Sequence, residues 1–503
     1  SWHRRLGLLV EYDANRYVDD YQAVLSGAHR REGGWGYGLE YRFGWLTTQL
    51  SIQDGETGAN LHLSVPLMRT EFVPKLHEPP PPPVQPSGQT LETWRTNPAA
   101  SKPLLQRLYA AGFARVSAGL DGDRLVVVLT HPRISLVGRA VGRAARISLA
   151  NGPNDMRALT ITYTRDDMPL LTYVFTDPEM LRRYFRGELD DAGLREHMTI
   201  ETWSTMINLP AEDTALGTVP PPTAEIRYGE DAHLMSVERR DALLSGFYLV
   251  PFNARIFFKD PSGAVRYDTY ATINFHRRLA PGWFADASAR FTWSEDVSKV
   301  AEASNSTLPH VRSDIVDYRR EGDRLRLETL LLSRYRRLAE PLYLRTSAGY
   351  YEEMYAGAGA QVLYLPTGRS WAFDFAVDAV RQREPGESFG FRDYRTVTAL
   401  GAFHYRLAQR GVTLTARFGR FLARDEGIRW EFRRRFRSGV EAGAWYTVTN
   451  ERDETAPGRA GNPEHDKGLF LSIPLNSMLT RDTRQRADLS VADYTRDVGQ
   501  MVR

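Results

Sequence analysis

Apolar and polar residues alternate with a period of two in segment after segment from about residue 223 to the end of the chain. This period places successive side chains on opposite faces of an extended strand and does not fit a helix. The sequence has no run of about 18 apolar residues, which a membrane-spanning helix requires, so helical membrane insertion is excluded. We therefore expect antiparallel strands near residues 245–259, 265–279, 282–293, 323–335, 341–355, 357–365, 371–382, 394–407, 411–423, 427–436, 439–450, 467–475 and 486–494.

The segment 371–380 illustrates the two folds that this alternation allows. Trp371, Phe373 and Phe375 lie on one face of the strand, and Asp374 and Asp378 lie on the other. A soluble sandwich would bury the apolar face, whereas an outer-membrane barrel would turn it toward lipid and enclose the charges. The number of strands, the scarcity of crossover helices and the Tyr and Trp residues near strand ends favour the barrel. We expect a mostly β fold, with one or more antiparallel transmembrane β-barrels and an inserted small α+β domain.

Changes in composition divide the chain into four parts. Residues 1–67 alternate like strands, residues 68–100 form a Pro-rich linker, residues 101–220 mix helix and strand patterns, and residues 221–503 carry the barrel strands. The third part predicts helices at 102–111 and 135–149, hairpins at 115–130 and 159–175, and a helix capped by Asp177 with Pro178 at its first position. Exposed hairpin edges of this domain, such as 124–130, are expected to dock partners.

A short repeat links the first and the last strand regions. Residues 61–67 (LHLSVPL) match residues 469–475 (LFLSIPL) at five of seven positions, and both copies close a series of strands. Four strands are too few for a closed barrel, whose smallest forms need about 8. We therefore expect residues 1–67 to be the terminal strands of a first β-barrel, whose other strands are missing or belong to another chain.

Several motifs of the second strand region carry a resemblance to a known family. They are Tyr350–Tyr364, Ala379–Glu384, Gly419–Gly427, Asp466–Gly468 with the strand that follows it, Thr495–Gln500 and, near the start of the chain, Val10–Asn15. Together these segments resemble the YjbH/GfcD family of Gram-negative outer-membrane proteins from exopolysaccharide and group 4 capsule clusters. The resemblance implies two β-barrels joined by a periplasmic module, and it brings no established catalytic residues.

The sequence lacks the common motifs of catalytic and metal-binding sites. The sequence has no cysteine, its histidines are scattered without an HExxH pattern, and it has no Gly-x-Ser-x-Gly or Walker loop. On a strand Glu352 and Glu353 point to opposite faces, and Asp374 and Asp378 lie about 13 Å apart, beyond the usual carboxylate spacing of a glycosidase. We expect no catalytic residues, no cofactor and no metal. The formal net charge of +3 also disfavours nucleic acid as a partner.

The candidate substrate path consists of polar and aromatic residues on the faces that should line the barrel lumen. They are Asp374, Asp378, Arg417, Arg429, Glu431, Arg433, Arg435, Glu441 and Trp445. Two interpretations of the arginines remain open. They form a cationic wall for an acidic polysaccharide, with Trp445 as a stacking surface, or they pair with Glu431, Glu441 and neighbouring carboxylates inside a wet lumen.

The sequence thus predicts an outer-membrane component of exopolysaccharide or capsule secretion that is a passive conduit for a polysaccharide chain. A structural or assembly factor, in which the barrel anchors a periplasmic recruitment domain, is the alternative, and an envelope glycan hydrolase is a third and weaker one. The expected partners are outer-membrane lipid, the polysaccharide, and periplasmic or lipoprotein components of the export system. The expected location is the outer membrane of a Gram-negative bacterium, with residues 101–220 in the periplasm.

Overall fold

The computed structural model contains three β assemblies: a four-stranded sheet, a six-stranded sheet and a closed barrel. The first belongs to one compact unit, residues 1–72, and the other two belong to a second unit, residues 73–503. The structure describes residues 5–12, 34–43, 46–53, 56–64, 67–68, 87–165, 168–201, 233–237, 245–260, 263–280, 282–301, 307–339, 341–366, 369–452, 463–480, 482–493 and 497–502.

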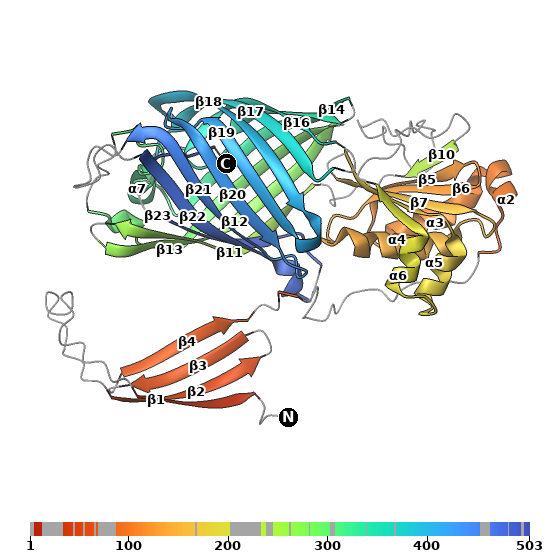
Figure 1. Ribbon diagram of the computed structural model, residues 1–503, viewed down its shortest axis with the longest axis horizontal. Coiled ribbons are helices and arrows are strands. Elements are labelled where there is room, and N and C mark those ends of the chain that lie inside the picture. The colour runs from red at the N-terminus through yellow and green to blue at the C-terminus, as the bar shows by residue number, and fades with distance from the viewer. Residues whose placement is uncertain are drawn as a thin grey trace. The chain divides into compact units, whose positions relative to one another are not determined.

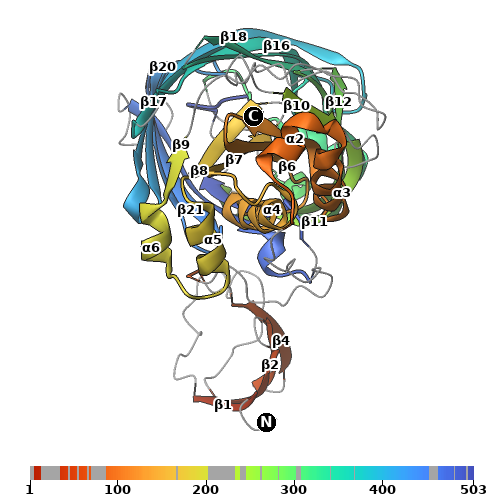
Figure 2. The same ribbon diagram turned by 90° about the vertical axis from the view of Figure 1, so that its right-hand side faces the viewer.

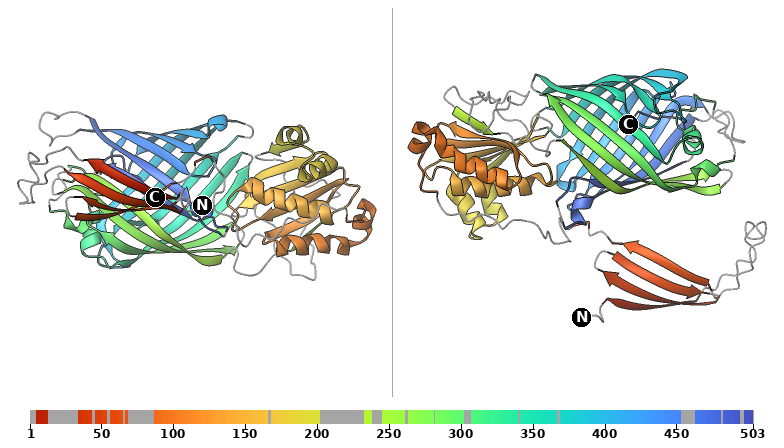
Figure 3. Two further views of the ribbon diagram at one scale, coloured as in Figure 1. Left: turned by 90° about the horizontal axis from the view of Figure 1, so that it is seen from below. Right: turned by 180° about the vertical axis from the view of Figure 1, so that it is seen from behind.

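The first unit is an open antiparallel sheet in the order β1-β2-β3-β4. Its strands, which Figure 3 draws in red to orange, are β1 (Leu6–Tyr12), β2 (Trp35–Phe43), β3 (Leu46–Gln53) and β4 (Glu56–Leu63). The predicted alternation is present in β2, where Trp35, Tyr37 and Leu39 are all exposed on one face. Within the described part of this unit, β1 and β4 are edges with one paired neighbour each.

The second assembly is a sheet in the order β10-β5-β6-β7-β8-β9, in which only β6 and β7 run parallel. The predicted helix start at Asp177 is confirmed, because the Asp177 carboxylate accepts hydrogen bonds from the backbone N–H groups of Glu179 and Met180. The elements are α2 (Leu91–Thr96), α3 (Lys102–Ala110), β5 (Ala114–Asp121), β6 (Arg124–Thr130), α4 (Val137–Asn151), β7 (Ala158–Arg165), β8 (Met168–Phe175), α5 (Pro178–Phe185), α6 (Asp191–Glu196), β9 (Met198–Glu201) and β10 (His233–Val237).

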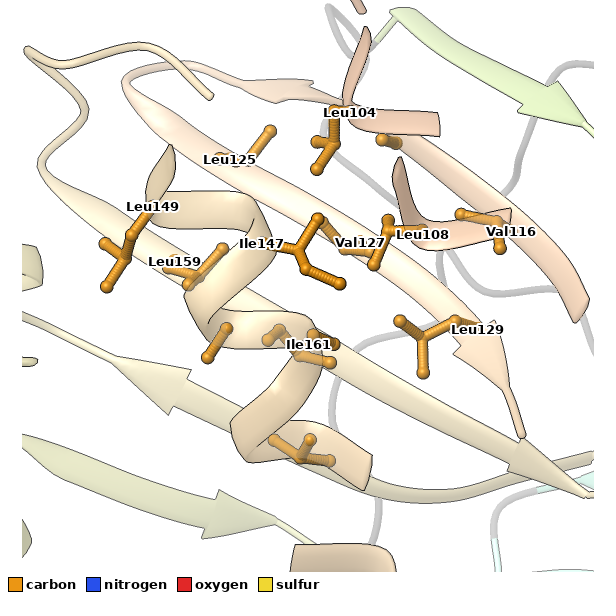
Figure 4. Close-up of a cluster of buried hydrophobic side chains, with 14 of the residues drawn as sticks. Leu104, Leu108, Val116, Leu125, Val127, Leu129, Ile147, Leu149, Leu159 and Ile161 are labelled. Carbon is orange, nitrogen blue, oxygen red and sulfur yellow. The ribbon is translucent and has the colours of Figure 1, made fainter. Parts of the chain in front are cut away.

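The core of this domain lies between α3, α4 and one face of the sheet (Figure 4). Leu104 and Leu108 of α3 are fully buried, as is Leu125 of β6, and burial of each such side chain contributes about 1.5–3 kcal/mol. β6 lies between β5 and β7 at the centre of the sheet. The prediction of 124–130 as an exposed docking edge is therefore wrong, and the described edges are β9 and β10.

Two predicted boundaries of the domain also need correction. α2 lies within the predicted linker 68–100, but its Leu91 and Trp94 are buried in the same core as α3 and α4. β10 lies beyond residue 220, yet it pairs with β5. The domain therefore includes Leu91 at one end and Val237 at the other. The Pro-rich stretches 79–83 and 220–222 lie outside the described residues.

The third assembly is a closed barrel that runs from β11 to β23, and each of its strands overlaps a predicted segment (Figure 1). Apart from β11 and β23, neighbouring strands are consecutive in the sequence and antiparallel. The strands are β11 (Ser245–Asp260), β12 (Gly263–Ala280), β13 (Trp283–Glu295), β14 (Leu325–Ala339), β15 (Leu342–Tyr350), β16 (Tyr355–Tyr364), β17 (Trp371–Arg383), β18 (Phe391–Leu407), β19 (Val412–Arg420), β20 (Glu426–Arg435), β21 (Glu441–Arg452), β22 (Pro463–Pro474) and β23 (Arg486–Asp493).

The two faces of the barrel wall differ as the alternation predicts. On the outside, Phe373, Leu414 and Phe432 are exposed, with 37–45% of their surface accessible. On the inside, Asp374 is only 3% exposed, although it sits beside Phe373 in the sequence. The wall therefore has an apolar exterior and a polar interior.

The strand number of the barrel is odd, so β11 and β23 close it as a parallel pair. The chain therefore begins β11 at one end of the barrel and finishes β23 at the other, and we call these the amino end and the carboxyl end. Figure 2 shows the strands curving around the closed wall. Most amino-end connections are short, whereas the carboxyl end carries the long connection between β13 and β14.

That connection contains α7 (Ile315–Arg320) and folds onto the inner wall at the carboxyl end (Figure 1). We call its described residues, 296–301 and 307–322, the lumen insert. Its Val311, Ile315 and Tyr318 are buried in a hydrophobic cluster with residues of β16, β17 and neighbouring turns. Residues 497–502, the C-terminal tail, return to the same end, where Asp497 and Val498 are buried.

Candidate functional site

The barrel encloses a cavity of about 760 Å³, large enough for a small ligand or a few sugar units. Side chains from β11, β12, β14 and β20–β23 line it. Arg312 and Ile315 of the lumen insert and Met501 of the tail also belong to the lining. The cavity therefore ends against the insert and the tail on its carboxyl side.

The structure brings five of the nine predicted path residues to this cavity and leaves four elsewhere. The cavity-lining residues are Arg429, Glu431, Arg433, Glu441 and Trp445. Asp374, Asp378, Arg417 and Arg435 are not part of the described lining. Arg417 lies opposite Arg429 in the pairing of β19 with β20, and Arg435 approaches Glu441 from the end of β20.

Three of the four predicted path arginines, Arg429, Arg433 and Arg435, lie within 4 Å of carboxylates. Arg433 donates to Glu431 at 3.0 Å and to Glu441 at 3.2 Å, and Arg435 lies 3.8 Å from Glu441. Arg486 of β23, which sequence reasoning did not select, lies 3.7 Å from the same Glu441 carboxylate. The geometry matches the paired interpretation of these arginines and contradicts an unpaired cationic wall.

Two aromatic side chains lie on the lumen side of β21 and β22. Trp445 and Phe470 are nearly parallel, with an interplanar angle of 20° and ring centroids 6.5 Å apart. The Trp445 Nε1–H donates to Asp466 at 2.7 Å, which fixes the indole orientation. The Arg429 guanidinium lies 4.9 Å from the Trp445 ring centre and that of Arg433 lies 5.0 Å from the Phe470 ring centre.

Asp374 belongs to a separate polar group on β16–β18. It accepts hydrogen bonds from Gln361 at 2.8 Å, and its other carboxylate oxygen lies 2.6 Å from the His404 Nε2. The second His404 nitrogen contacts the Thr415 hydroxyl at 2.9 Å. These partners hold Asp374 as a fixed part of the wall.

A buried ion cluster fastens the lumen insert to the barrel wall. Arg319 of α7 donates to Asp268 of β12 at 3.0 Å and to both oxygens of Glu353 in the turn 351–354. Arg290 of β13 joins the same two carboxylates. Burial acts to raise the pKa of Glu353, but Arg319 and Arg290 outweigh it and hold this pKa well below its usual value.

The insert also reaches the opposite wall. Arg392 of β18 donates to Asp314 and to Asp317, each at 2.8 Å. Since β12 and β18 are six places apart in the ring, the Arg392 contacts and the contact between Arg319 and Asp268 involve strands on opposite sides of the barrel. The insert therefore crosses the carboxyl end of the lumen and is fastened at both sides.

The C-terminal tail is held against the insert and a neighbouring turn. Asp497 accepts hydrogen bonds from the backbone N–H groups of Arg312 and Ser313, at 2.7 and 3.0 Å. The Gly499 N–H donates to Asp425 in the turn between β19 and β20. Burial raises the pKa of Asp425 to about 6, although this N–H bond opposes the shift.

The sequence analysis predicts no element between the strands 282–293 and 323–335, so it missed the insert. The spacing of Val311, Ile315 and Tyr318 is the one available signal, since it places three apolar side chains on one helical face. Among the described residues no group of three or more His, Asp or Glu side chains could hold a metal ion. The described helices are all too short or too polar to cross a membrane.

Comparisons with known proteins identify the family. A family model described as YjbH, exopolysaccharide biosynthesis protein YbjH, matches residues 1–503. The chain is 27% identical over 509 residues to the uncharacterized lipoprotein YjbH of Escherichia coli (strain K12). The aligned region covers 99% of this chain and 67% of that protein.

Two outer-membrane proteins are among the similar solved structures. Salmonella typhi OmpF in complex with daunomycin has a TM-score of 0.27 and 9% identity, over 50% of this chain and 97% of that one. The loop L8 deletion mutant of OmpT, an outer membrane protein of Vibrio cholerae, has a TM-score of 0.23 and 10% identity, over 46% and 87%. Because the family model covers the whole sequence, the chain belongs to the YjbH family of exopolysaccharide biosynthesis proteins.

Proposed function

We propose that the barrel spans the outer membrane of a Gram-negative bacterium and is a passive conduit for an exopolysaccharide chain. The observation that carries this proposal is a closed barrel with an apolar exterior and a polar cavity inside it, in a chain of an exopolysaccharide family. The strands have 8 to 18 residues, which suits a span that needs about 9–11 tilted residues. Trp371, Tyr364 and Tyr405, near strand ends on the outside, suit a membrane interface.

The order of the chain supports an orientation. The α+β domain immediately precedes β11 in the sequence, so the chain enters the barrel from this domain at the amino end. In outer-membrane barrels the short turns face the periplasm and the long connections face outward. In this proposal the α+β domain is periplasmic and meets periplasmic or lipoprotein components of the export system, while β1–β4 pair with further strands.

The lumen insert favours a second candidate function. An insert that crosses the carboxyl end of the lumen leaves the barrel suited to anchoring the α+β domain as an assembly platform, without passage of polymer. In the conduit proposal the insert must leave this position when polymer passes. The two candidates therefore differ in whether a blocked lumen stops secretion.

Single cysteines test the membrane topology, because the chain contains none of its own. In purified outer membranes, cysteines at Phe373, Leu414 and Phe432 should be shielded from a water-soluble maleimide. A cysteine at Arg433, the neighbour of Phe432 on the lumen face, should react. Equal labelling of positions 432 and 433 in folded protein would refute the membrane-spanning barrel.

Secretion separates the conduit from the anchor. A bulky maleimide attached to the cysteine at Arg433 should block the lumen and abolish secreted polymer if the barrel is the conduit. The same adduct at Arg410, which is exposed in the amino-end turn after β18, should leave secretion unchanged. Normal secretion with position 433 fully modified would contradict the conduit and favour the anchor.

A further inference from the structure

Trp445 and Phe470 lie flat on the barrel wall because each covers a glycine of the neighbouring strand. A Cβ atom added at Gly468 would lie 2.1 Å from the Trp445 ring, and one added at Gly443 would lie 2.3 Å from the Phe470 ring. Only a residue without a side chain allows such close contact with the backbone. The two nearly parallel rings both line the cavity, and we call them the aromatic floor; the guanidinium groups of Arg429 and Arg433 lie at 4.9 and 5.0 Å from their ring centres and share this part of the wall.

Charged side chains of both signs surround the aromatic floor. Glu441 is the centre of this set, because it lies within 4 Å of three arginines. Asp466 links the floor to the set, since it accepts from Trp445 and lies 3.7 Å from Arg429. The cations are Arg429, Arg433 and Arg486 of the cavity lining and Arg435 beside Glu441, and the anions are Glu431, Glu441, Asp466, Asp488 and Asp493 of the lining.

We propose that the aromatic floor and its rim of paired arginines and carboxylates form a binding subsite for neutral pyranose units of a polysaccharide. This inference rests on the proposed function and adds the class of polymer to it. A pyranose ring has one face of C–H groups, which stacks on a flat aromatic ring. Its hydroxyls both donate and accept, so they need guanidinium donors and carboxylate acceptors side by side, as the rim provides them.

The pairing of these arginines with carboxylates decides between neutral and acidic sugars. An unpaired row of arginines would raise the local concentration of anions, which is the basis for expecting an acidic polymer. Here each of Arg433, Arg435 and Arg486 lies near Glu441, so a sugar carboxylate would have to compete with that side chain. A neutral sugar carries no such cost, because its hydroxyls bridge existing ion pairs without separating them.

Binding to the purified, full-length protein in detergent tests this inference by calorimetry. Maltohexaose and cellohexaose are the neutral probes, and hexagalacturonate is the acidic probe of equal length. At least one neutral probe should bind at millimolar concentration, more tightly than hexagalacturonate and with little dependence on salt. No neutral binding to folded protein, or tighter and salt-sensitive hexagalacturonate binding, would overturn the subsite.

Variants locate the binding at the floor. Trp445→Ala and, with less loss of volume, Phe470→Leu should each weaken neutral binding about fivefold or more, since ring stacking contributes about 1 kcal/mol. Trp430→Ala is the matched control, because Trp430 lies on the outer face of β20. Unchanged affinity in both floor variants, with the barrel folded, would place the sugar elsewhere.

The charge argument has its own variant. Glu441→Gln removes the carboxylate shared by three arginines, so hexagalacturonate should gain affinity, and added salt should reverse the gain. If hexagalacturonate binds no better to this variant, the charge argument is wrong. The two proposals can fail separately. If no sugar binds but the cysteine at Arg433 reacts with maleimide, the subsite is wrong and the conduit proposal stands. If that cysteine does not react, the conduit proposal is wrong, whatever the binding measurements show.

Discussion

Arg319→Met should release the lumen insert from the barrel wall. Arg319 is the insert's contribution to the buried ion cluster, with a side chain 3% exposed and hydrogen bonds to both Asp268 and Glu353. Removing one partner of a buried ion pair costs about 3–5 kcal/mol, because the remaining charges stay buried without full compensation. If this cost falls on docking of the insert, the undocked population rises by about 10² to 10⁴, at about 1.4 kcal/mol per factor of ten.

Maleimide labelling of a cysteine at Ile315 measures this release. Ile315 lies on α7 and is 8% exposed, so its cysteine should react slowly while the insert is docked and faster in proportion to the undocked population. Arg320→Met is the matched control, because Arg320 donates to the backbone carbonyls of Ser298 and Val300 within the insert itself. The variant Arg319→Met should label about 10² times faster or more than Arg320→Met.

A second substitution tests the cause of the cost. Glu353→Gln removes one carboxylate that Arg319 neutralises, so the double variant should label more slowly than the sum of the two single effects predicts. Additive effects would mean that unpaired charge is not the reason for the release. Equal labelling rates for Arg319→Met and Arg320→Met would refute the ion cluster as the fastening of the insert.

Three further predictions concern the other parts of the chain. Leu108→Ala, at a fully buried position of α3, should cost the α+β domain about 2–5 kcal/mol by hydrogen exchange of its core amides, whereas Leu170→Ala, at a position 42% exposed, should cost far less. Burial lowers the pKa of His131 to about 4, so the unfolded chain binds the proton more tightly than the folded domain does. As the pH falls from 7 to 5, the free energy of opening measured at the same amides should therefore fall by about 2 kcal/mol. His131→Asn, which keeps an acceptor for the Ile134 N–H, should remove this pH dependence. Residues 1–72 alone should associate through the β1 and β4 edges, and a stable monomer in light scattering would contradict the expectation that they need partner strands.

The barrel strands could be predicted because each strand has one face toward an apolar exterior and one face toward a polar lumen. In β17 and β20 the exterior favours Phe373 and Phe432 while the lumen favours Asp374 and Arg433, so each residue carries information about its face. Consecutive hairpins need no long-range information beyond this alternation. Strand existence and order therefore followed from the sequence.

The lumen insert could not be predicted in the same way, because its partners are distant in the sequence. Arg319 meets Asp268 and Glu353 only once β12 and the turn after β15 have taken their places in the ring. A sequence with 65 Lys and Arg residues and 62 Asp and Glu residues offers many such pairings, and composition does not choose among them. The pairing of Arg433 with Glu441 likewise depends on the register of β20 with β21.

The domain boundaries failed for a related reason. α2 has only six residues, and its Leu91 and Trp94 become core residues through contacts with later elements. β10 has five residues and pairs with β5, more than a hundred positions earlier in the chain. Short elements whose stability comes from distant neighbours leave little local pattern, so proline-rich composition dominated the prediction there.

The parallel pairing of β11 with β23 sets the order in which the barrel can fold. This pair joins Ala254 to Leu489, 235 positions apart, while every other neighbouring pair in the barrel joins strands that are consecutive in the sequence. Closing a loop of that length costs about 5 kcal/mol of chain entropy, against about 2 kcal/mol for a loop of roughly ten residues. The hairpins can therefore form early, but the cylinder closes only after β23 has been added, and until then both outer strands present open hydrogen-bonding edges to any other chain nearby.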